Sequence, residues 1–230
     1  MTEQFEFDFL KERENYSVND FLVFSGNKEA FHFLNQKDIG IIGVIFLVGE
    51  KKSGKTYLAN IWKSNVNAKF IDYQSISRMR LENFNSTLLN RIEYYENYII
   101  DNFDFTKFDE NKLFHLLNII QLKKCNLLIT TSNNVSRIRF SISDLKSRIN
   151  STIKIKIGKL NDEVRYILFL KLFSDEKIIL KTQTAKYIFK FAPDNYFDLY
   201  NFVKNVISVS KTEKSKITIP FFKKSVSKIV

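Results

Sequence analysis

The stretch GEKKSGKT, residues 49–56, is the strongest indication of fold in this sequence. It matches G-x-x-x-x-G-K-[ST] at every required position, and the apolar run VIFLV at residues 44–48 precedes it. In such a loop the glycines let backbone N–H groups turn inward around phosphates, and the N-terminus of the following helix adds positive potential. The lysine reaches the β- and γ-phosphate oxygens, while the threonine hydroxyl is offered to magnesium. An ordinary glycine loop is the alternative. We expect a nucleotide to be bound by the following residues: Gly49, Glu50, Lys51, Lys52, Ser53, Gly54, Lys55 and Thr56.

Strand-length apolar runs recur around this loop, at residues 68–72, 97–101, 126–131 and 152–157. Longer segments between them, such as 55–65 and 109–123, have helical spacing. Strands that alternate with helices predict a parallel sheet covered on both faces. The run at 152–157 alternates in polarity and is expected at an edge, whereas the others are nearly continuous in apolar character, as buried central strands are.

The pattern changes after Gly158, where only helices are predicted. Asn161 is suited to be an N-cap, and the acidic Asp162 and Glu163 follow in the first turn. Further helical stretches are predicted at 182–191, at 196–208 and after Pro220. We therefore expect an N-terminal segment at 1–14, an α/β domain at 15–158 and a small all-helical lid at 159–230.

Composition excludes several classes of protein. The 230 residues are 44% hydrophobic and 27% charged, which is typical of a folded chain. No stretch approaches the length of a membrane span and no signal segment opens the chain, so a cytoplasmic protein without membrane contact is expected. Cys125 is the only cysteine, and His32 and His115 are isolated, which argues against a disulfide or a zinc site. The formal charge of +11 has two explanations: a polyanionic partner, or a general drift in composition with scattered lysines.

A second acidic position is expected where a neighbouring strand ends, to help hold magnesium. The stretch YIIDNFDF supplies Asp101, so Thr56 and Asp101 are the predicted magnesium ligands, although Asp101 could instead cap a loop. Asn102 stands where related ATPases usually have a second carboxylate. Because an amide cannot take a proton from water, we expect weak hydrolysis or none by the isolated protein.

Arg148, in DLKSRI at residues 144–149, precedes the last predicted strand. In nucleotide-dependent assemblies an arginine at this place can reach the γ-phosphate of a neighbouring subunit and stabilise the transition state in trans. A surface arginine paired with a carboxylate is the alternative.

The N-terminal stretch QFEFDF alternates large apolar and acidic residues. Phe5, Phe7 and Phe9 would lie on one side of an extended segment that begins at Gln4. Both an edge strand and a peptide captured by a partner fit this pattern.

Together these stretches resemble the DnaA family of AAA+ proteins, and most of all its Hda-type regulators. The resemblance covers nearly the whole chain. Residues 16–31 resemble the nucleotide-base segment of the family, with matches at Asp20, Phe21, Val23 and Asn27. IIDN, LLITTSNN, DLKSRI and KITIPFFKKSV resemble the Asp-Asn pair, the sensor-one strand, the arginine-finger segment and the C-terminal end of such regulators.

The resemblance implies an AAA+ core with a helical lid that binds ADP or ATP with Mg²⁺. It implies that Gln4, Phe5, Phe7 and Phe9 bind the DNA polymerase sliding clamp, so that contact with DNA is indirect. It also implies that Arg148 acts as a finger on ATP bound to the initiator DnaA, which makes the chain a negative regulator of replication initiation. A helix-turn-helix domain is not expected after the lid, and self-association is compatible with the family.

Two places depart from the family pattern. Phe197 stands at the lid position of the sensor-two arginine, and a phenylalanine cannot contact a phosphate. Ser132 and Asn133 stand where the sensor-one region often carries an aspartate. Two rival functions therefore stay open: an ATP-hydrolysing truncated initiator or helicase loader, and a non-catalytic clamp adaptor.

Overall fold

The computed structural model describes residues 16–38, 40–73 and 78–229. The predicted clamp-binding residues Gln4, Phe5, Phe7 and Phe9 lie outside these ranges. The strands are β1 (Val44–Val48), β2 (Lys69–Phe70), β3 (Asn97–Ile100), β4 (Asn126–Thr131) and β5 (Ile153–Lys156). Within the described part of the first 151 residues, the chain forms the helices α1 (Lys28–Leu34), α2 (Lys55–Val66), α4 (Leu81–Arg91), α5 (Glu110–Leu122) and α6 (Ser143–Ser151), with short 3-10 turns at Val18–Asp20 and Val135–Arg137.

The five strands form a parallel sheet in the order β2-β3-β4-β1-β5, which confirms the predicted α/β class. The central strand β4 is buried along its whole length. β5 lies at one edge, as its alternating pattern predicts. The expectation of a buried central strand at 68–72 is wrong: only Lys69 and Phe70 pair, both are exposed, and β2 is the other edge. The position of a strand in a sheet depends on which distant segments pair with it. An apolar run can therefore lie at an edge as well as in the centre.

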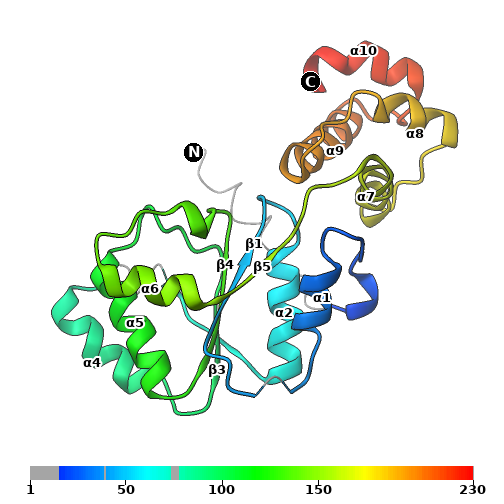
Figure 1. Cartoon of the computed structure of the whole chain (residues 1–230). Helices are drawn as coiled ribbons and strands as arrows, with labels where there is room; N and C mark the ends of the chain where they lie inside the picture. The colour runs from blue at the N-terminus through cyan, green and yellow to red at the C-terminus, as the bar shows by residue number, and fades with distance from the viewer. Residues whose placement is uncertain (1–15, 39, 74–77, 230) are drawn as a thin grey trace.

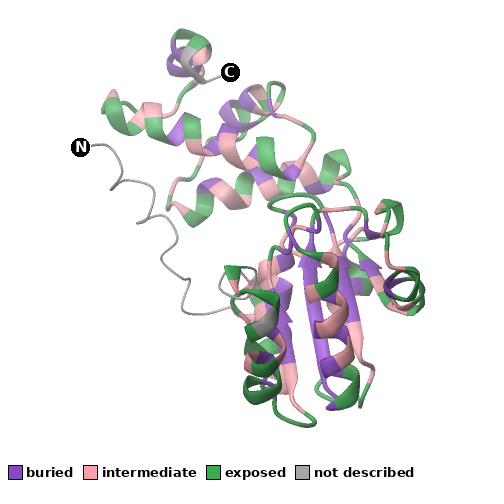
Figure 2. Cartoon of the chain, turned by 90° about the vertical axis from the view of Figure 1, so that its left-hand side faces the viewer, coloured by how far each residue is buried: buried purple, intermediate pink, exposed green. Residues whose placement is uncertain are grey.

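Helices cover both faces of the sheet, giving three layers (Figures 1 and 2). α4, α5 and α6 pack on one face around Phe46, Leu116 and Ile129. α1 and α2 pack on the other face around Leu47, Trp62 and Leu128. Adjacent side chains of one strand point to opposite faces, so β1 contributes Phe46 to one core and Leu47 to the other.

The remaining helices, α7 (Asp162–Asp175), α8 (Thr182–Phe189), α9 (Tyr196–Thr212) and α10 (Ile219–Ile229), lie beyond the carboxyl ends of the strands (Figure 1). Asn161 caps α7 as predicted, since its Oδ1 accepts a hydrogen bond from the Val164 N–H at 2.8 Å. These helices share a core that includes Phe169, Leu199 and Phe222. Within the described residues, no helix is both long and apolar enough to cross a membrane.

Candidate nucleotide-binding site

The loop after β1 has a conformation that depends on two glycines, Gly49 and Gly54. Gly54, which precedes α2, has φ +94°, a left-handed value that favours glycine. At Gly49 a Cβ atom would come within 2.7 Å of Ser53 Oγ and 3.1 Å of Ile157 Cβ, so a side chain there would crowd the loop. Ser53 Oγ is buried without a hydrogen-bond partner. A buried hydroxyl of this kind beside the glycines is compatible with a polar ligand in the loop.

Lys55 lies under this loop and is only 4% exposed. Its Nζ donates to the carbonyl oxygens of Gly49 at 3.0 Å and Glu50 at 2.8 Å. Burial lowers the pKa of the ammonium, and the charges of Asp101 and Glu50 oppose that shift. The ammonium is thus held among loop carbonyls at the N-terminus of α2, where it can exchange these bonds for phosphate oxygens.

Asp101, directly after β3, lies opposite the first turn of α2. Its Oδ2 accepts hydrogen bonds from Thr56 Oγ1 at 2.7 Å and from Asn102 Nδ2 at 3.1 Å. Its Oδ1 accepts a bond from Thr130 Oγ1, which in turn accepts one from the Asn102 N–H at 2.9 Å. The structure therefore brings the predicted pair Thr56 and Asp101 together, and it adds Thr130, a buried threonine at the end of β4, which the sequence reasoning missed.

These hard oxygen atoms suit magnesium. Mg²⁺ in nucleotide enzymes is commonly held by one or two carboxylates and the phosphates themselves. The described residues contain no group of three or more His, Cys, Asp or Glu side chains placed to hold a metal ion. Thr56 and Asp101 would hold the ion, which would neutralise phosphate charge.

A cavity of about 960 Å³ opens over the loop. It is lined by Lys51, Lys52, Gly54, Lys55, Thr56, Tyr57, Tyr73, Asp101, Asn102, Phe103, Asp104, Lys107, Ser132, Asn133 and Phe197. Phe197 comes from the first turn of α9, so the C-terminal helices place an aromatic ring in the wall of this cavity. Lys51 Nζ lies 5.8 Å from the centre of the Phe197 ring, and Lys52 Nζ lies 4.4 Å from that of Tyr200. The lid therefore meets the phosphate loop through lysine–aromatic contacts.

A smaller cavity of about 290 Å³ adjoins the same loop, and its wall is mainly apolar. Phe21, Phe24 and Tyr57 line it from the sheet domain, and Leu160, Leu168 and Tyr196 from the lid, among others. Asn27 holds the backbone of residues 22–24 beside this cavity. Its side chain accepts a hydrogen bond from the Phe24 N–H at 2.8 Å and donates one to the Leu22 carbonyl at 2.9 Å. An aromatic and aliphatic pocket next to a phosphate loop is suited to a nucleobase.

The lid residues of this pocket were missed by sequence reasoning. α7 carries apolar residues on most of its surface, with Ile167 and Leu170 exposed and Leu168 facing the pocket. An unusually broad apolar surface on a helix was the one available signal.

Arg148 lies far from this site. α6 places it in the wall of a different pocket, together with Gly43, Val44 and Ile153 at the amino ends of β1 and β5. The phosphate loop follows the carboxyl end of β1, so the five residues of β1, about 16 Å at ~3.3 Å each, separate the two places.

The Arg148 guanidinium has close neighbours on the surface. Its Nε donates to Asp144 Oδ2 at 3.0 Å and a terminal nitrogen donates to Gln121 Oε1 at 2.5 Å. It also lies 5.6 Å from the centre of the Phe114 ring. The alternative of an arginine paired with a surface carboxylate therefore describes this geometry, which leaves a role in trans untested.

Comparison with known proteins identifies relatives. No protein-family profile matches the chain. The chromosomal replication initiator protein DnaA of Buchnera aphidicola subsp. Cinara cedri is 26% identical over 237 residues, covering 94% of this chain and 53% of that protein. The chain thus spans about half the length of the curated relatives it matches.

Solved structures share the fold. Domain III of the Thermotoga maritima replication initiation protein DnaA superposes with a TM-score of 0.73 at 18% identity, covering 94% of this chain and 98% of that one. AMPPCP-bound DnaA from Aquifex aeolicus has a TM-score of 0.63 at 16% identity, with 85% and 64% covered. Sequence similarity along nearly the whole chain, joined to this shared fold, shows homology to the AAA+ domain of the DnaA family.

Proposed function

We propose that this chain is a nucleotide-binding AAA+ protein that acts in the initiation of chromosomal replication. In detail, it would bind the DNA-loaded sliding clamp and stimulate hydrolysis of ATP held by the initiator DnaA, as a negative regulator. The observation that carries the proposal is the convergence of Lys55, Thr56 and Asp101 on one cavity beside an apolar pocket.

ADP or ATP with Mg²⁺ is the proposed ligand. A DnaA structure of the same fold binds the ATP analogue AMPPCP, and the oxygen and ammonium groups here are of the kinds that hold a nucleoside polyphosphate with magnesium. Asn102 lines the cavity with an amide, which cannot take a proton from water. This favours nucleotide binding with little hydrolysis over the rival of an independent ATPase.

Arg148 is proposed to act on the nucleotide of a partner. Its distance from its own phosphate loop leaves it no role at that site, while its position at the opposite end of β1 is open to a neighbouring subunit. The contacts with Asp144 and Gln121 would then hold the guanidinium at the surface. The proposed contact with the clamp rests on the pattern of Gln4, Phe5, Phe7 and Phe9 alone.

The first test is direct nucleotide binding. Titration with fluorescent ADP and Mg²⁺ should show binding by the natural chain and its loss in Lys55→Ala, because the phosphates lose their buried cation. Lys63→Ala, on the exposed side of the same helix, should bind normally and serves as the control. Equal binding by Lys55→Ala would exclude this site.

The second test follows labelled ATP prebound to the cognate initiator, with DNA-loaded clamp. Conversion to ADP should require clamp, this protein and Arg148 together. Arg148→Ala should lower the rate about 10³-fold, the magnitude associated with an arginine finger. Lys146→Ala, exposed on the same helix, should not. Absence of conversion with intact clamp binding would favour the adaptor, and turnover by the chain alone would favour the independent ATPase.

A further inference from the structure

Large apolar side chains are exposed at the amino-terminal edge of the sheet, the edge that also carries Arg148. We call them the amino-edge patch: Ile41 (59% exposed), Leu89 (41%), Tyr94 (59%), Tyr95 (64%) and Leu122 (63%). They come from the segment before β1, the last turns of α4 and α5, and the α4–β3 loop. Exposed apolar groups gathered in this way mark an interaction site more often than scattered single ones do.

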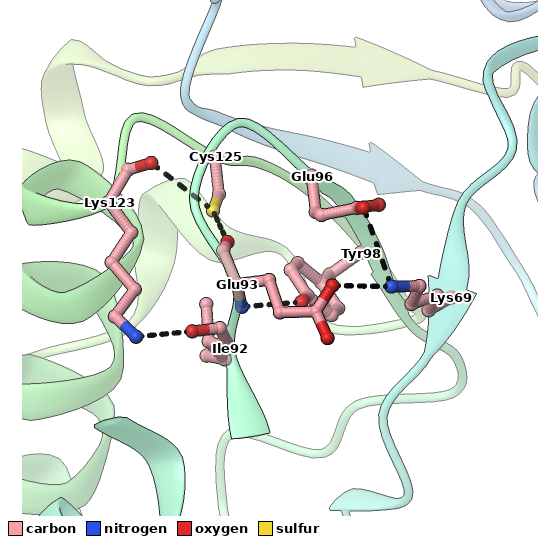
Figure 3. Close-up of polar contacts among 7 residues, drawn as sticks. All are labelled: Lys69, Ile92, Glu93, Glu96, Tyr98, Lys123 and Cys125. Carbon is pink, nitrogen blue, oxygen red and sulfur yellow. Dashed lines mark hydrogen bonds and ion pairs between the residues drawn. The ribbon is translucent and has the colours of Figure 1, made fainter. Parts of the chain in front are cut away.

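Glu93 and Glu96, which flank the two tyrosines in sequence, make polar contacts with side chains of neighbouring elements (Figure 3). Cys125 Sγ donates to the Glu93 carbonyl at 3.0 Å, and the Glu93 N–H donates to Tyr98 Oη at 2.9 Å. Lys69 pairs with Glu93 at 2.9 Å and with Glu96 at 3.4 Å. Side chains from β2, β3 and the α5–β4 turn thus hold one short loop from three sides.

Buried Lys123 completes this support. Its Nζ donates to the Leu89 carbonyl at 2.5 Å and also to the Ile92 carbonyl, while its own carbonyl accepts from the Tyr95 N–H at 3.0 Å. Tyr95 has φ +60° and Lys124 has φ +53°, values that are uncommon for such residues and persist where the surroundings impose them. The tyrosines are therefore displayed by a preorganised loop, which lowers the entropic cost of binding.

The patch is continuous with Arg148. Lys124 Nζ lies 5.8 Å from the centre of the Tyr95 ring. Lys124 also lines a pocket of about 540 Å³ with Ile41, Gln121 and Arg148, and Gln121 holds the Arg148 guanidinium. An apolar surface thus leads directly to a pocket lined by two cations, Lys124 and Arg148, and by one carboxylate, Asp144, which pairs with Arg148.

We propose that the amino-edge patch is the docking surface for the nucleotide-loaded initiator, and that it brings the initiator's bound phosphates to Arg148. This inference rests on the proposed function and names the surface that function requires. Lys124 and Arg148 outnumber the single carboxylate of this pocket, Asp144, so its net positive charge complements an anionic face, such as bound ATP presents. Tyrosine and arginine are enriched among residues that dominate binding energy between proteins. Single-stranded nucleic acid is a less suitable partner. It binds to aromatic rings by stacking and to cations through its phosphates, and neither interaction involves the exposed aliphatic side chains of Ile41 and Leu122.

The test separates docking from catalysis. A patch variant would carry Tyr94→Ser, Tyr95→Asn and Leu122→Gln, with asparagine chosen because it tolerates a positive φ. In the assay of initiator-bound ATP with clamp, it should need about tenfold more protein for half-maximal hydrolysis, with an unchanged maximal rate. Arg148→Ala should do the reverse. Ile179→Gln, on the lid and 94% exposed, is the matched control. Unaltered nucleotide binding and thermal unfolding would show that the patch variant folds.

The remaining outcomes of the assay either support or overturn docking of the initiator at the amino-edge patch. A patch variant indistinguishable from the natural chain, while the natural chain is active, would overturn it and leave the proposed function intact. If the natural chain stimulates no hydrolysis, binding of ATP-loaded initiator is measured by anisotropy: loss in the patch variant supports the docking surface, and no loss overturns it.

Two results would show that the amino-edge patch binds a partner other than the initiator. If the variant changes the sedimentation of the chain alone, the surface joins copies of this chain. If it weakens binding of a labelled oligothymidine of about 20 nucleotides but leaves the initiator response unchanged, the surface binds nucleic acid. Either result overturns docking of the initiator.

Discussion

Asn102 has a backbone that an asparagine accepts more readily than most residues, with φ +54° at the point where the chain leaves β3. Its amide donates to Asp101 and its N–H donates to Thr130, so the side chain is placed at the cavity by contacts on both sides. The chemistry at this position thus depends on the identity of one side chain, because the backbone already places it beside the proposed magnesium ligand.

Replacing Asn102 by aspartate should increase hydrolysis of ATP by the isolated chain on the order of 10²-fold, the lower end of what a positioned general base contributes. Two adjacent carboxylates also repel each other, which raises the pKa of one of them and makes that carboxylate a better proton acceptor. Steady-state release of phosphate measures this effect, and Asn102→Ala is the control that removes the amide without adding a base. If Asn102→Asp binds nucleotide but stays inactive, a missing carboxylate is not what limits hydrolysis.

At the scale of elements, α9 determines how the lid meets the nucleotide cavity. Asn195 caps it by accepting from the Asp198 N–H at 2.9 Å, which places Phe197 in the first turn over the phosphate loop. The cations that line the cavity, Lys51, Lys52, Lys55 and Lys107, all come from the sheet domain. The lid therefore contributes an aromatic ring and no cation to the wall of this cavity.

Phe197→Arg should create a preference for ATP over ADP of about tenfold or more, because a hydrogen bond to a charged group contributes roughly 1.5–3 kcal/mol. The natural chain and Phe197→Leu should bind the two nucleotides with similar affinity. Competition against a fluorescent nucleotide gives both constants for each protein. Strong discrimination by the natural chain would show that another residue reads the γ-phosphate.

At the scale of the whole molecule, the candidate site joins the two parts of the chain. The apolar pocket has walls from both parts, and the Gly158 N–H donates to the Gly26 carbonyl at 2.6 Å where the lid begins. Tyr196 Oη of the lid also donates to the Gly158 carbonyl at 3.3 Å. A bound nucleotide would touch both parts and stabilise them together.

Mg²⁺ with ADP at 100 times its dissociation constant should stabilise the fold by about 2.7 kcal/mol. At about 2–4 °C per kcal/mol for a chain of this size, the unfolding midpoint should rise by roughly 5–11 °C. Scanning calorimetry with and without nucleotide measures the shift, and Lys55→Ala should show none at the same concentration. A shift confined to one of two resolved transitions would mean that the nucleotide contacts one part only.

Local patterns predicted much of this architecture, and the failures have a common cause. The loop at 49–56, the N-cap at Asn161 and the strands of the parallel sheet were predictable because each depends on residues close in sequence. The edge position of β2 was not, since an apolar run does not specify its partners. The contact of Arg148 with Gln121 joins residues 27 positions apart, so no pattern within a few residues of either one predicts it.

The loop at 49–56, the succession of strands and helices along the chain and the change to helices alone after β5 can all be predicted from the amino-acid sequence, because backbone propensity, capping and periodicity act over a few residues. Three features follow from the packing of distant segments instead: Thr56 and Thr130 both hydrogen-bond to Asp101, Phe197 lines the nucleotide cavity, and Arg148 lies at the opposite end of the sheet beside the amino-edge patch. These features depend on which distant segments pack together, and packing is a property of the whole chain.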